Sequence, residues 1–501
     1  MTYFVTGATG FIGRYLVQSL LQKGKGTIYV LVRPKSIGKL DELREFWGKD
    51  SLKRVVPIKG DLGLPKLGVA RGDLTKLKGK VKHFYHLGAV YDIEASAEAM
   101  EKANITGTRG ALEFAEAVNA GCFHLVSSIA AAGLYRGTFT EDMFEEAEEL
   151  EHPYHRTKHD SEAMVRANGR IPFRVYRPGA VLGHSQTGFI DKIDGPYYFF
   201  KALQKLRESW PRSIPLVGIE GGYINVVPVD FVVDALVHLS HQPKLDGRCF
   251  HLTDPKARRV GEVLNVFARA AHAPEMAFRL DPKVFAMVPE PVTQSVQRSK
   301  PIQNVFNQLL RDLQVPRSVL QFVNYPTRFD STATQKILDK AKIRVPALED
   351  YAWRLWDYWE RHLDPDLSID RSLKGAVKGK VVMITGGSSG IGEAAAIRIA
   401  EAGGKVIVVA RDEEKLAEVR KKITDAGGFV KTYSCDITEY AANDKLAKDV
   451  LKEFGHVDVL INNAGRSIRR SLALSYDRFH DFERTMQLNY FACVRLTMNL
   501  L

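Results

Sequence analysis

Two stretches of the chain repeat one pattern of apolar and polar positions. The first begins at Tyr3 and reads YFVTGATGFIGRYLVQSLLQKGKGTIYVLVRPKS, and the second begins at Lys380 and reads KVVMITGGSSGIGEAAAIRIAEAGGKVIVVARDEE. In each, an apolar run is followed by a glycine-rich turn, a helical stretch and a second apolar run that ends at an arginine. Continuous apolar runs are typical of strands buried on both faces of a parallel sheet. We therefore predict a βαβ unit at each place and an α/β fold.

The remaining segments fit two Rossmann-like, doubly wound parallel-sheet modules in tandem. From about residue 253 the pattern changes to helical stretches separated by prolines, which favours a mostly helical substrate cap on the first module. We expect Trp353, Trp356 and Trp359 to pack in the core of that cap. The predicted boundaries are 1–362 for the first module (core about 1–252, cap about 186–224 and 253–362), 363–378 for the linker, and 379–501 for the second module, which is incomplete.

Composition narrows the classes of function. Lys and Arg number 71 against 59 for Asp and Glu, and a positive surface suits anionic partners such as phosphorylated cofactors or coenzyme A. The four cysteines show no CxxC or CxxH spacing, so we predict neither a disulfide framework nor a metal site, and a reducing cytoplasm as the location. No apolar run approaches the ~20 residues of a membrane span. No basic stripe with interleaved aromatic residues points to nucleic acid.

Both glycine-rich turns predict dinucleotide sites. Three glycines in each motif allow the tight turn, the close approach of the backbone to a pyrophosphate, and the packing of helix on strand. The helix that follows offers its unpaired N–H groups to the phosphates. The predicted contacts are Thr6, Gly7, Thr9, Gly10, Phe11, Ile12 and Gly13 in the first motif, and Gly386, Ser388, Ser389, Gly390, Ile391 and Gly392 in the second.

The residue that ends each second strand indicates which dinucleotide binds. A carboxylate there holds the ribose 2′-hydroxyl of NAD, whereas this chain has Arg33 and Arg411, which suit a 2′-phosphate. The predicted cofactor of both modules is therefore NADPH. Further contacts are predicted at Asp61 and Leu62 and at Asp436 and Ile437, beside the adenine, and at Gly88 in HLGA and Asn463, Ala464 and Gly465 in NNAG.

These motifs together resemble the short-chain dehydrogenase/reductase superfamily. The first module is similar to the extended branch through TGATGFIG, YHRTK, YRPGAVLG and NVVPVDFVVDA, and the second to the shorter branch through TGGSSGIG and NNAG. In that superfamily the tyrosine and lysine of YxxxK are the catalytic pair, which implies Tyr154 and Lys158 here. Residues four apart face the same side of a helix, so both side chains can line the nicotinamide cleft.

The resemblance also implies a role for each catalytic residue. Tyr154 would be the general acid, with its pKa lowered by the nearby ammonium of Lys158, which would also hold the nicotinamide ribose. The third member should be a hydroxyl after the fifth strand. Ser127 and Ser128 are both candidates in FHLVSSIAAAG, and alignment with the family's strand ending favours Ser128 as a hydrogen-bond donor to the substrate oxygen. Asn104 in NITGT matches the family's helix-four asparagine, which would order the proton path.

The second module departs from the family pattern. The chain reaches the helix that carries Asn489 and ends at Leu501, before the strand, serine and YxxxK that should follow. This module could hold part of an NADPH molecule but could not perform tyrosine chemistry. We expect the chain to be part of a longer protein, since half of a doubly wound sheet would leave an apolar face uncovered.

The tandem arrangement resembles bacterial alcohol-forming fatty acyl-CoA reductases, which reduce a long-chain acyl thioester through the aldehyde to the alcohol with NADPH. The run INNAGRSIRRSLALSYDRFHDFERTMQLNYF is similar to reductases that convert acyl-CoA to fatty aldehyde. By implication the second module makes the aldehyde when complete, and the first reduces it to the alcohol. Neither step needs a nucleophilic cysteine, and we expect Cys122 and Cys249 to be buried fillers.

Several alternatives stay open from the sequence. The first module could itself reduce the thioester, or could be another alcohol dehydrogenase or epimerase of the extended branch. A protein that senses NADPH without catalysis is the alternative from a different class, although such proteins usually lose the tyrosine or lysine. Peripheral membrane contact through YYFFKALQKL or the cap stays open, as does a homo-oligomer.

Overall fold

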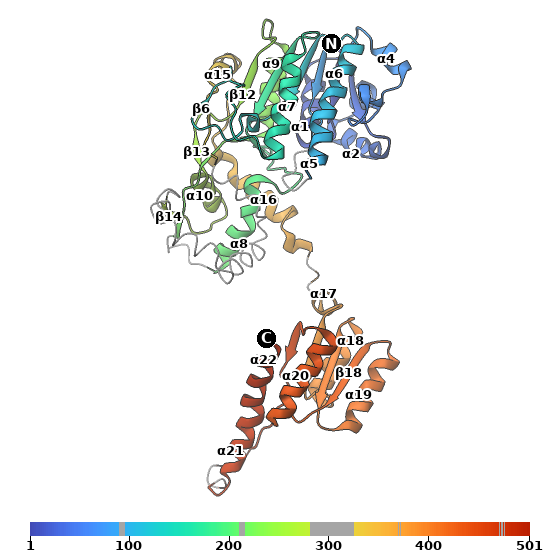
Figure 1. The fold of residues 1–501 in the computed structure, drawn as a ribbon, viewed down its shortest axis with the longest axis vertical. Coiled ribbons are helices and arrows are strands. Elements are labelled where there is room, and N and C mark those ends of the chain that lie inside the picture. Colours follow the sequence, from blue (N-terminus) through green and yellow to red (C-terminus); the bar gives the residue numbers. More distant parts are fainter. Residues whose placement is uncertain are drawn as a thin grey trace. The chain divides into compact units, whose positions relative to one another are not determined.

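The computed structural model describes residues 1–89, 96–209, 216–280, 325–368, 370, 372–469, 471, 474 and 476–501. The chain forms two compact units, Met1–Asp364 (unit 1) and Pro365–Leu501 (unit 2). Figure 1 shows both, coloured along the sequence. The division falls inside the linker expected at 363–378. That stretch holds a short 3-10 helix, η8 (Pro365–Ser368), and the helix α17 (Leu373–Val377).

Unit 1 is built on a seven-stranded parallel sheet. Its order is β12-β7-β5-β4-β1-β2-β3, so the chain runs outward from β1 to one edge and then outward from β4 to the other. This order creates a switch point between β1 and β4, where ligands of open α/β sheets bind at the carboxyl ends of the strands. The strands are β1 (Tyr3–Thr6), β2 (Ile28–Val32), β3 (Val55–Lys59), β4 (His83–His86), β5 (Cys122–Val126), β7 (Phe173–Pro178) and β12 (Cys249–Leu252).

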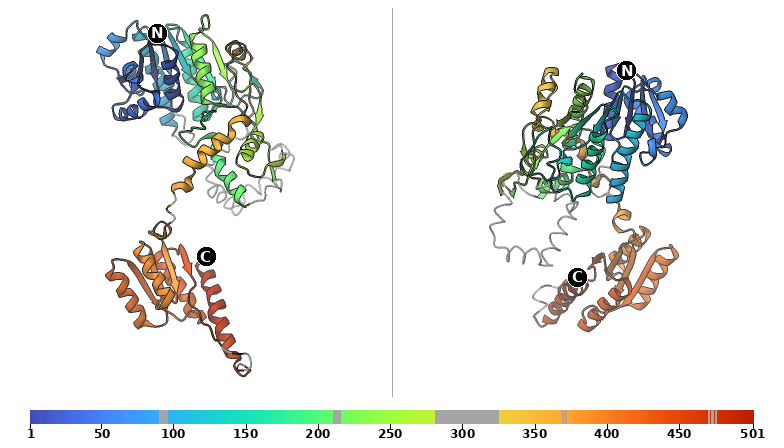
Figure 2. Two further views of the ribbon diagram at one scale, coloured as in Figure 1. Left: turned by 180° about the vertical axis from the view of Figure 1, so that it is seen from behind. Right: turned by 45° about the horizontal axis from the view of Figure 1, so that its top comes forward.

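Helices cover both faces of this sheet (Figures 1 and 2). Successive side chains of a strand point to opposite faces, so Tyr3 and Val5 pack into one hydrophobic cluster with α1 and α9, while Phe4 packs into the other with α6. The predicted doubly wound α/β fold of the first module is confirmed. The helices are α1 (Phe11–Lys23), α2 (Gly38–Trp47), α3 (Ser51–Arg54), α4 (Arg71–Leu77), α5 (Ala97–Met100), α6 (Gly107–Ala117), α7 (Pro153–Ala167) and α9 (Val229–His241).

A third hydrophobic cluster lies in the predicted cap, which mixes helices with short strand pairs where it is described. The predicted helix IQNVFNQLLRDL lies outside the described residues. The helices are α8 (Phe200–Ser209), α10 (Val260–Ala270) and α16 (Leu348–His362), and the strand pairs within the predicted ranges are β9 (Leu216–Ile219) with β14 (Met276–Leu280) and β10 (Tyr223–Ile224) with β13 (Arg258–Arg259). Two further pairs lie at the edge of the cap and include strands outside those ranges, β8 (Ala180–Leu182) with β11 (Val226–Pro228) and β6 (Thr138–Phe139) with β15 (Arg328–Phe329).

Two expectations about the cap need correction. Trp356 and Trp359 are buried, but Trp353 is 52% exposed, so the stripe was wrong at its first residue. A spacing of three falls short of the 3.6 residues of a helical turn, and the stripe therefore drifts out of the core. Helix α15 (Thr332–Leu338), inside the range assigned to the cap, packs on α9 and β12 of the nucleotide-binding core.

Part of the aromatic run YYFFKALQKL is buried. Tyr197 and Phe200 are almost completely buried in the third hydrophobic cluster, so these two rings are not available to a membrane surface. Within the described residues, no helix combines the length and the apolar character that a bilayer crossing requires.

Unit 2 repeats the first half of this architecture. Its four-stranded parallel sheet has the order β18-β17-β16-β19, the arrangement that β3-β2-β1-β4 has in unit 1. In the C-terminal helical segment, residues 479–500, apolar side chains such as Phe479 and Met498 are about 70% exposed. The elements are β16 (Val381–Thr385), α18 (Gly390–Glu401), β17 (Lys405–Ala410), α19 (Glu413–Asp425), β18 (Phe429–Ser434), α20 (Tyr440–Phe454), β19 (Val459–Ile461), α21 (Phe479–Met486) and α22 (Cys493–Leu500).

Candidate active site

The turn between β1 and α1 forms a cradle of backbone atoms. Gly7 has a φ of +72°, and a Cβ at this position would lie 2.8 Å from the backbone nitrogen of Gly88. A Cβ on Gly13 would lie 2.1 Å from the carbonyl oxygen of Gly7, so both positions require glycine. No side chain caps α1, whose N-cap residue is Gly10, and its first N–H groups are therefore available to an anion.

The ends of β1 and β4 are joined beside this cradle. The side-chain oxygen of Thr6 hydrogen bonds to Nδ1 of His86 at 2.8 Å and accepts a hydrogen bond from the backbone nitrogen of Gly88 at 3.2 Å. The Leu62 side chain fills the space next to Gly88, where a Cβ would lie 2.5 Å away. These contacts hold the switch point of the sheet in the shape that a dinucleotide needs.

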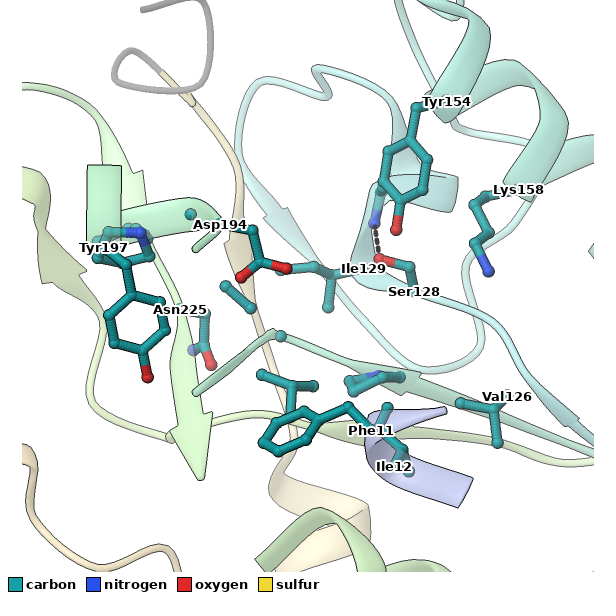
Figure 3. A pocket seen from close by; sticks show the side chains of 18 of the residues that line it. Phe11, Ile12, Val126, Ser128, Ile129, Tyr154, Lys158, Asp194, Tyr197 and Asn225 are labelled. Atoms are coloured by element: carbon teal, nitrogen blue, oxygen red, sulfur yellow. Dashed lines mark hydrogen bonds between the residues drawn. The ribbon is translucent and has the colours of Figure 1, made fainter. Parts of the chain in front are cut away.

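The remaining cofactor positions of unit 1 surround the cradle. Arg33 follows β2 and is exposed, and within the described parts of the chain no ion pair is found for it. Asp61 accepts a hydrogen bond from the backbone nitrogen of Gly63 at 2.9 Å, which shapes the loop after β3. Phe11 and Ile12 line the main cavity (Figure 3), and Thr9 lies in the turn before α1.

Three predicted catalytic side chains meet in a single cavity of about 470 Å³. Tyr154 and Lys158 project from α7, whose first turn is fixed by Pro153 and by the His152 ring, which accepts from the backbone nitrogen of Tyr154. Ser128 follows β5, and its Oγ accepts a hydrogen bond from the backbone nitrogen of Ala130 at 3.2 Å. Figure 3 shows the Ser128 hydroxyl next to the Tyr154 phenol, with the Lys158 side chain on the other side of the phenol.

The electrostatics of the pair differ from the expectation. Burial raises the pKa of Tyr154 above its usual value, and the Asp194 carboxylate raises it further, while the hydrogen bond with Ser128 lowers it. The expected lowering by Lys158 is therefore wrong for this site, because removal of the phenol from water dominates. Burial lowers the pKa of Lys158 to about 8, against the attraction of the Glu162 carboxylate. At neutral pH the phenol keeps its proton and can donate it.

The two adjacent serines have different roles in the structure. The Ser127 hydroxyl donates to the carboxylate of Glu162 at 3.0 Å. That carboxylate also accepts from Arg177, at 2.6 and 3.0 Å, and from Arg166 at 2.8 Å. The Ser128 hydroxyl is therefore the one that forms a hydrogen bond with Tyr154. Sequence reasoning missed the Glu162 network, whose only local signal is an acidic residue one turn after the lysine.

Asn104 lies in a π-helical turn, Glu101–Thr106, between α5 and α6. Its side-chain nitrogen donates to Oγ1 of Thr157, which stands between the tyrosine and the lysine on α7, at 3.1 Å. Such π-helical turns are rare and frequent at functional sites. Asn489 of unit 2 lies in a second π-helical turn, Gln487–Ala492, and its amide bonds the backbone of Arg466.

The opposite wall of the cavity is mostly apolar. It is lined by Ile190, Pro196, Phe199 and Leu264, with polar groups at Asn225 and Asp194. Figure 3 shows the Asn225 and Asp194 side chains across the cavity from helix α7, which carries Tyr154 and Lys158. An apolar wall facing a hydroxyl-rich wall fits a carbonyl compound with a hydrocarbon chain. None of these residues was predicted from the sequence, because none belongs to a motif.

Unit 2 contains a similar cradle without the catalytic set. Gly386 has a φ of +66°, and a Cβ on Gly392 would lie 2.4 Å from its carbonyl oxygen. The side chain of Asn463 donates to the backbone carbonyls of Thr385 and Gly386, both at 3.0 Å, and the Ala464 nitrogen donates to the Thr385 hydroxyl. The loop of NNAG is thereby tied to the end of β16.

The other predicted positions of unit 2 lie around this cradle. Arg411 pairs with Asp436 at 3.4 Å on the surface, so the predicted 2′-phosphate ligand already has a carboxylate partner. Ser389 is the N-cap residue of α18 and makes no side-chain cap, and Ile391 in the first turn is 84% exposed. Ser388, Gly390, Ile437 and Gly465 complete the set of predicted contacts, of which Ile437 is buried in the core of the unit.

The residues of unit 1 fit a nicotinamide dinucleotide. The Lys158 ammonium is buried, lines the cavity, and has no hydrogen-bond or ion-pair partner in the portion of the chain that the structure describes. A buried charge without a partner is costly, and hydroxyl groups of a bound ribose would satisfy it. No group of three or more metal-ligating side chains occurs among the described residues.

Comparisons with known proteins agree with this geometry. Residues 5–236 match the family described as male sterility protein, and residues 380–501 match the short chain dehydrogenase family. A fatty acyl-CoA reductase of Acinetobacter baylyi is 58% identical over 125 residues, which are 25% of this chain and 42% of that protein. A glycine betaine reductase of Emericella nidulans is 26% identical over 518 residues, covering 97% of this chain and 39% of that protein.

A solved structure also resembles the chain. The terminal R domain from the myxalamid PKS-NRPS biosynthetic pathway aligns with a TM-score of 0.58 at 25% identity, over 73% of this chain and 92% of that domain. The chain spans only about two-fifths of each of the two curated relatives. The chain therefore carries two domains in tandem, one that matches the male sterility protein family and one that matches the short chain dehydrogenase family.

Proposed function

We propose that the chain belongs to an NADPH-dependent reductase of long-chain fatty acyl thioesters, and that unit 1 performs its carbonyl reduction at Tyr154. The observation that carries the proposal is the meeting of Ser128, Tyr154 and Lys158 with the glycine cradle in one cavity. NADPH, when bound, supplies the hydride. Gly7, Gly10 and Gly13 would hold its pyrophosphate, as glycine turns at helix N-termini do.

The side chains of unit 1 would complete the reduction. As the carbonyl carbon accepts hydride, its oxygen gains negative charge, and the Tyr154 phenol donates a proton to it. The Ser128 hydroxyl stabilises the same oxygen by a hydrogen bond. The Lys158 ammonium holds the nicotinamide ribose and offsets the developing charge. An aldehyde then leaves as the alcohol.

In our proposal unit 1 takes the aldehyde to the alcohol, and the second module takes acyl-CoA to the aldehyde when it is complete. A second candidate has unit 1 reduce the thioester itself. Likeness to the R domain of a PKS-NRPS, and the likeness of 97% of this chain to 39% of a glycine betaine reductase, favour this candidate. In that step the first product is a hemithioacetal, which expels the thiol and leaves the aldehyde, so no cysteine nucleophile is needed.

Preference for NADPH is part of the proposal. Arg33 at the end of β2 is exposed and suits a 2′-phosphate, which is the group that distinguishes NADPH from NADH.

Cys122 and Cys249 are buried, and burial raises the pKa of both thiols to about 12, so neither is a ready nucleophile. Hydride transfer to a bound carbonyl therefore remains the best-supported chemistry.

The test is NADPH consumption by the full chain with a long-chain fatty aldehyde and, separately, with the matching acyl-CoA. We expect aldehyde turnover that Tyr154→Phe reduces by roughly 10²–10⁴-fold. Tyr358→Phe on α16, outside the cavity lining, is the matched control and should keep its activity. Turnover of acyl-CoA that depends on Tyr154 would select the second candidate. No Tyr154-dependent turnover of either substrate would refute the proposal.

A further inference from the structure

Two arginines from distant parts of unit 1 stack on one aromatic ring at the cavity. The guanidinium carbon of Arg259 lies 4.3 Å from the centroid of the Tyr223 ring, and that of Arg328 lies 5.7 Å from it. Tyr223 lines the cavity that contains Tyr154. Two like charges beside one ring repel each other, so this arrangement is favoured when an anion accompanies it.

The backbone holds these three residues together. Tyr223 on β10 is directly opposite Arg259 on β13, and its N–H donates to the carbonyl of Tyr325 at 2.7 Å. Tyr325 begins the segment that leads to β15, where Arg328 lies between the cavity-lining residues Thr327 and Phe329. The Tyr223 ring thus lines the cavity, and the two arginines that stack on it come from the paired strand β13 and from β15, next to lining residues but not themselves part of the lining.

Among the residues that the structure describes, no carboxylate neutralises the charges of the two arginines. Their neighbour Arg258 is paired with Glu349 at 2.7 Å and with Asp254 at 3.6 Å. In contrast, within the described ranges no carboxylate forms an ion pair with Arg259 or Arg328. The Arg259 side chain donates to the carbonyl of Gly221 at 3.1 Å, and Glu262 accepts from the Arg259 backbone nitrogen.

We propose that Arg259 and Arg328, stacked on Tyr223, bind the phosphate of the pantetheine arm of a thioester substrate. The inference rests on the proposed function in its second form, in which unit 1 accepts a thioester. A thioester has two arms, and the apolar wall at Ile190 and Phe199 suits the acyl arm. The other arm carries a phosphate in coenzyme A and in carrier proteins alike. Guanidinium groups recognise phosphate by charge-assisted hydrogen bonds.

The direct test compares two probes that differ by one phosphate. Calorimetry on the full chain, saturated with NADPH to occupy the dinucleotide sites, would measure binding of 4′-phosphopantetheine and of pantetheine. We expect 4′-phosphopantetheine to bind more tightly than pantetheine, and Arg259→Ala/Arg328→Ala to remove roughly tenfold or more of its affinity. Arg269→Ala is the matched control, because Arg269 lies on α10 and is already paired with Glu275 at 2.6 Å.

A kinetic test separates this inference from the proposed function. The double variant should raise KM for acyl-CoA and for the same acyl group on a carrier protein, with little change in kcat, and should leave KM for the acyl N-acetylcysteamine thioester unchanged. An effect confined to one of the two donors would identify the source of the phosphate. Arg328→Gln alone, at an exposed position, serves if the double variant misfolds.

Two results would overturn the inference. One is equal binding of both probes by the unaltered chain. The other is unchanged phosphopantetheine affinity in the double variant. Because the calorimetry needs no turnover, a chain that consumes neither thioester nor aldehyde would refute the proposed function while the phosphate site is still judged by its own measurement.

Discussion

Replacement of Glu162 by glutamine should affect both the stability of unit 1 and the pH dependence of its chemistry. The Glu162 and Arg177 side chains are both completely buried and lie 2.6 Å apart. Glutamine keeps the size of the side chain but leaves the Arg177 guanidinium buried without an opposite charge. Breaking a buried pair in this way costs ~3–5 kcal/mol, a large share of the ~5–15 kcal/mol that typically holds a domain folded.

Tryptophan fluorescence during urea unfolding would measure this loss. All five tryptophans of the chain lie between Trp47 and Trp359, so the signal reports unit 1 alone. Glu116→Gln is the matched control, because Glu116 pairs with Arg170 at a site where the arginine is 79% exposed. Such a surface pair contributes ~0.2–1 kcal/mol. Equal losses for the two variants would show that the Glu162 network does not support the fold as we argue.

The same variant should change the pH profile of NADPH consumption. Burial lowers the pKa of Lys158 to about 8, although the Glu162 carboxylate acts in the opposite direction and raises it. Activity that needs the ammonium should therefore decline as the pH rises through about 8, and Glu162→Gln should move that decline to lower pH. A decline at an unchanged pH in a folded variant would contradict the assignment of the alkaline limb to Lys158.

Three further outcomes are expected. Gly13→Ala should lower the free energy of unfolding by ~1–3 kcal/mol through overpacking and abolish dinucleotide binding, because its Cβ would lie 2.1 Å from a backbone oxygen. Gly24→Ala, at the end of the same helix with open space around it, is the control and should have neither effect. Urea unfolding would measure the stability, and NADPH fluorescence titration would measure the binding. Acid should destabilise unit 1, since burial lowers the pKa of His86 and of His251 to about 3. The unfolded chain then binds more protons below pH 6.5, and stability should fall by roughly 2–3 kcal/mol per histidine between pH 6.5 and 4.5, with a flat profile as the contrary result. Arg33→Asp should raise KM for NADPH at least tenfold and leave KM for NADH unchanged or lower, and an unchanged cofactor preference would remove Arg33 from the 2′-phosphate site.

The local pattern of the sequence was enough to predict the two βαβ units and their glycine turns. Strand burial, turn geometry at Gly7 and helix periodicity depend on neighbours along the chain, and the seven-stranded and four-stranded sheets follow from them. The resemblance to the short-chain dehydrogenase/reductase superfamily implied the pair Tyr154 and Lys158, and a spacing of four is consistent with it because it places two side chains on one helical face. The sequence also determined that unit 2 has no serine and YxxxK set within this chain.

Only the tertiary structure decided which side chains of the site contact one another. The choice between Ser127 and Ser128 depended on Glu162 and Arg177, which reach the end of β5 from α7 and β7. The direction of the Tyr154 pKa depended on how much water the fold removes from the phenol, which no spacing reports. Tyr223 and Arg328, which stack on each other, are more than a hundred residues apart in the sequence. Contacts of this kind arise from packing between distant segments, and their energies depend on burial, so they are absent from any local pattern.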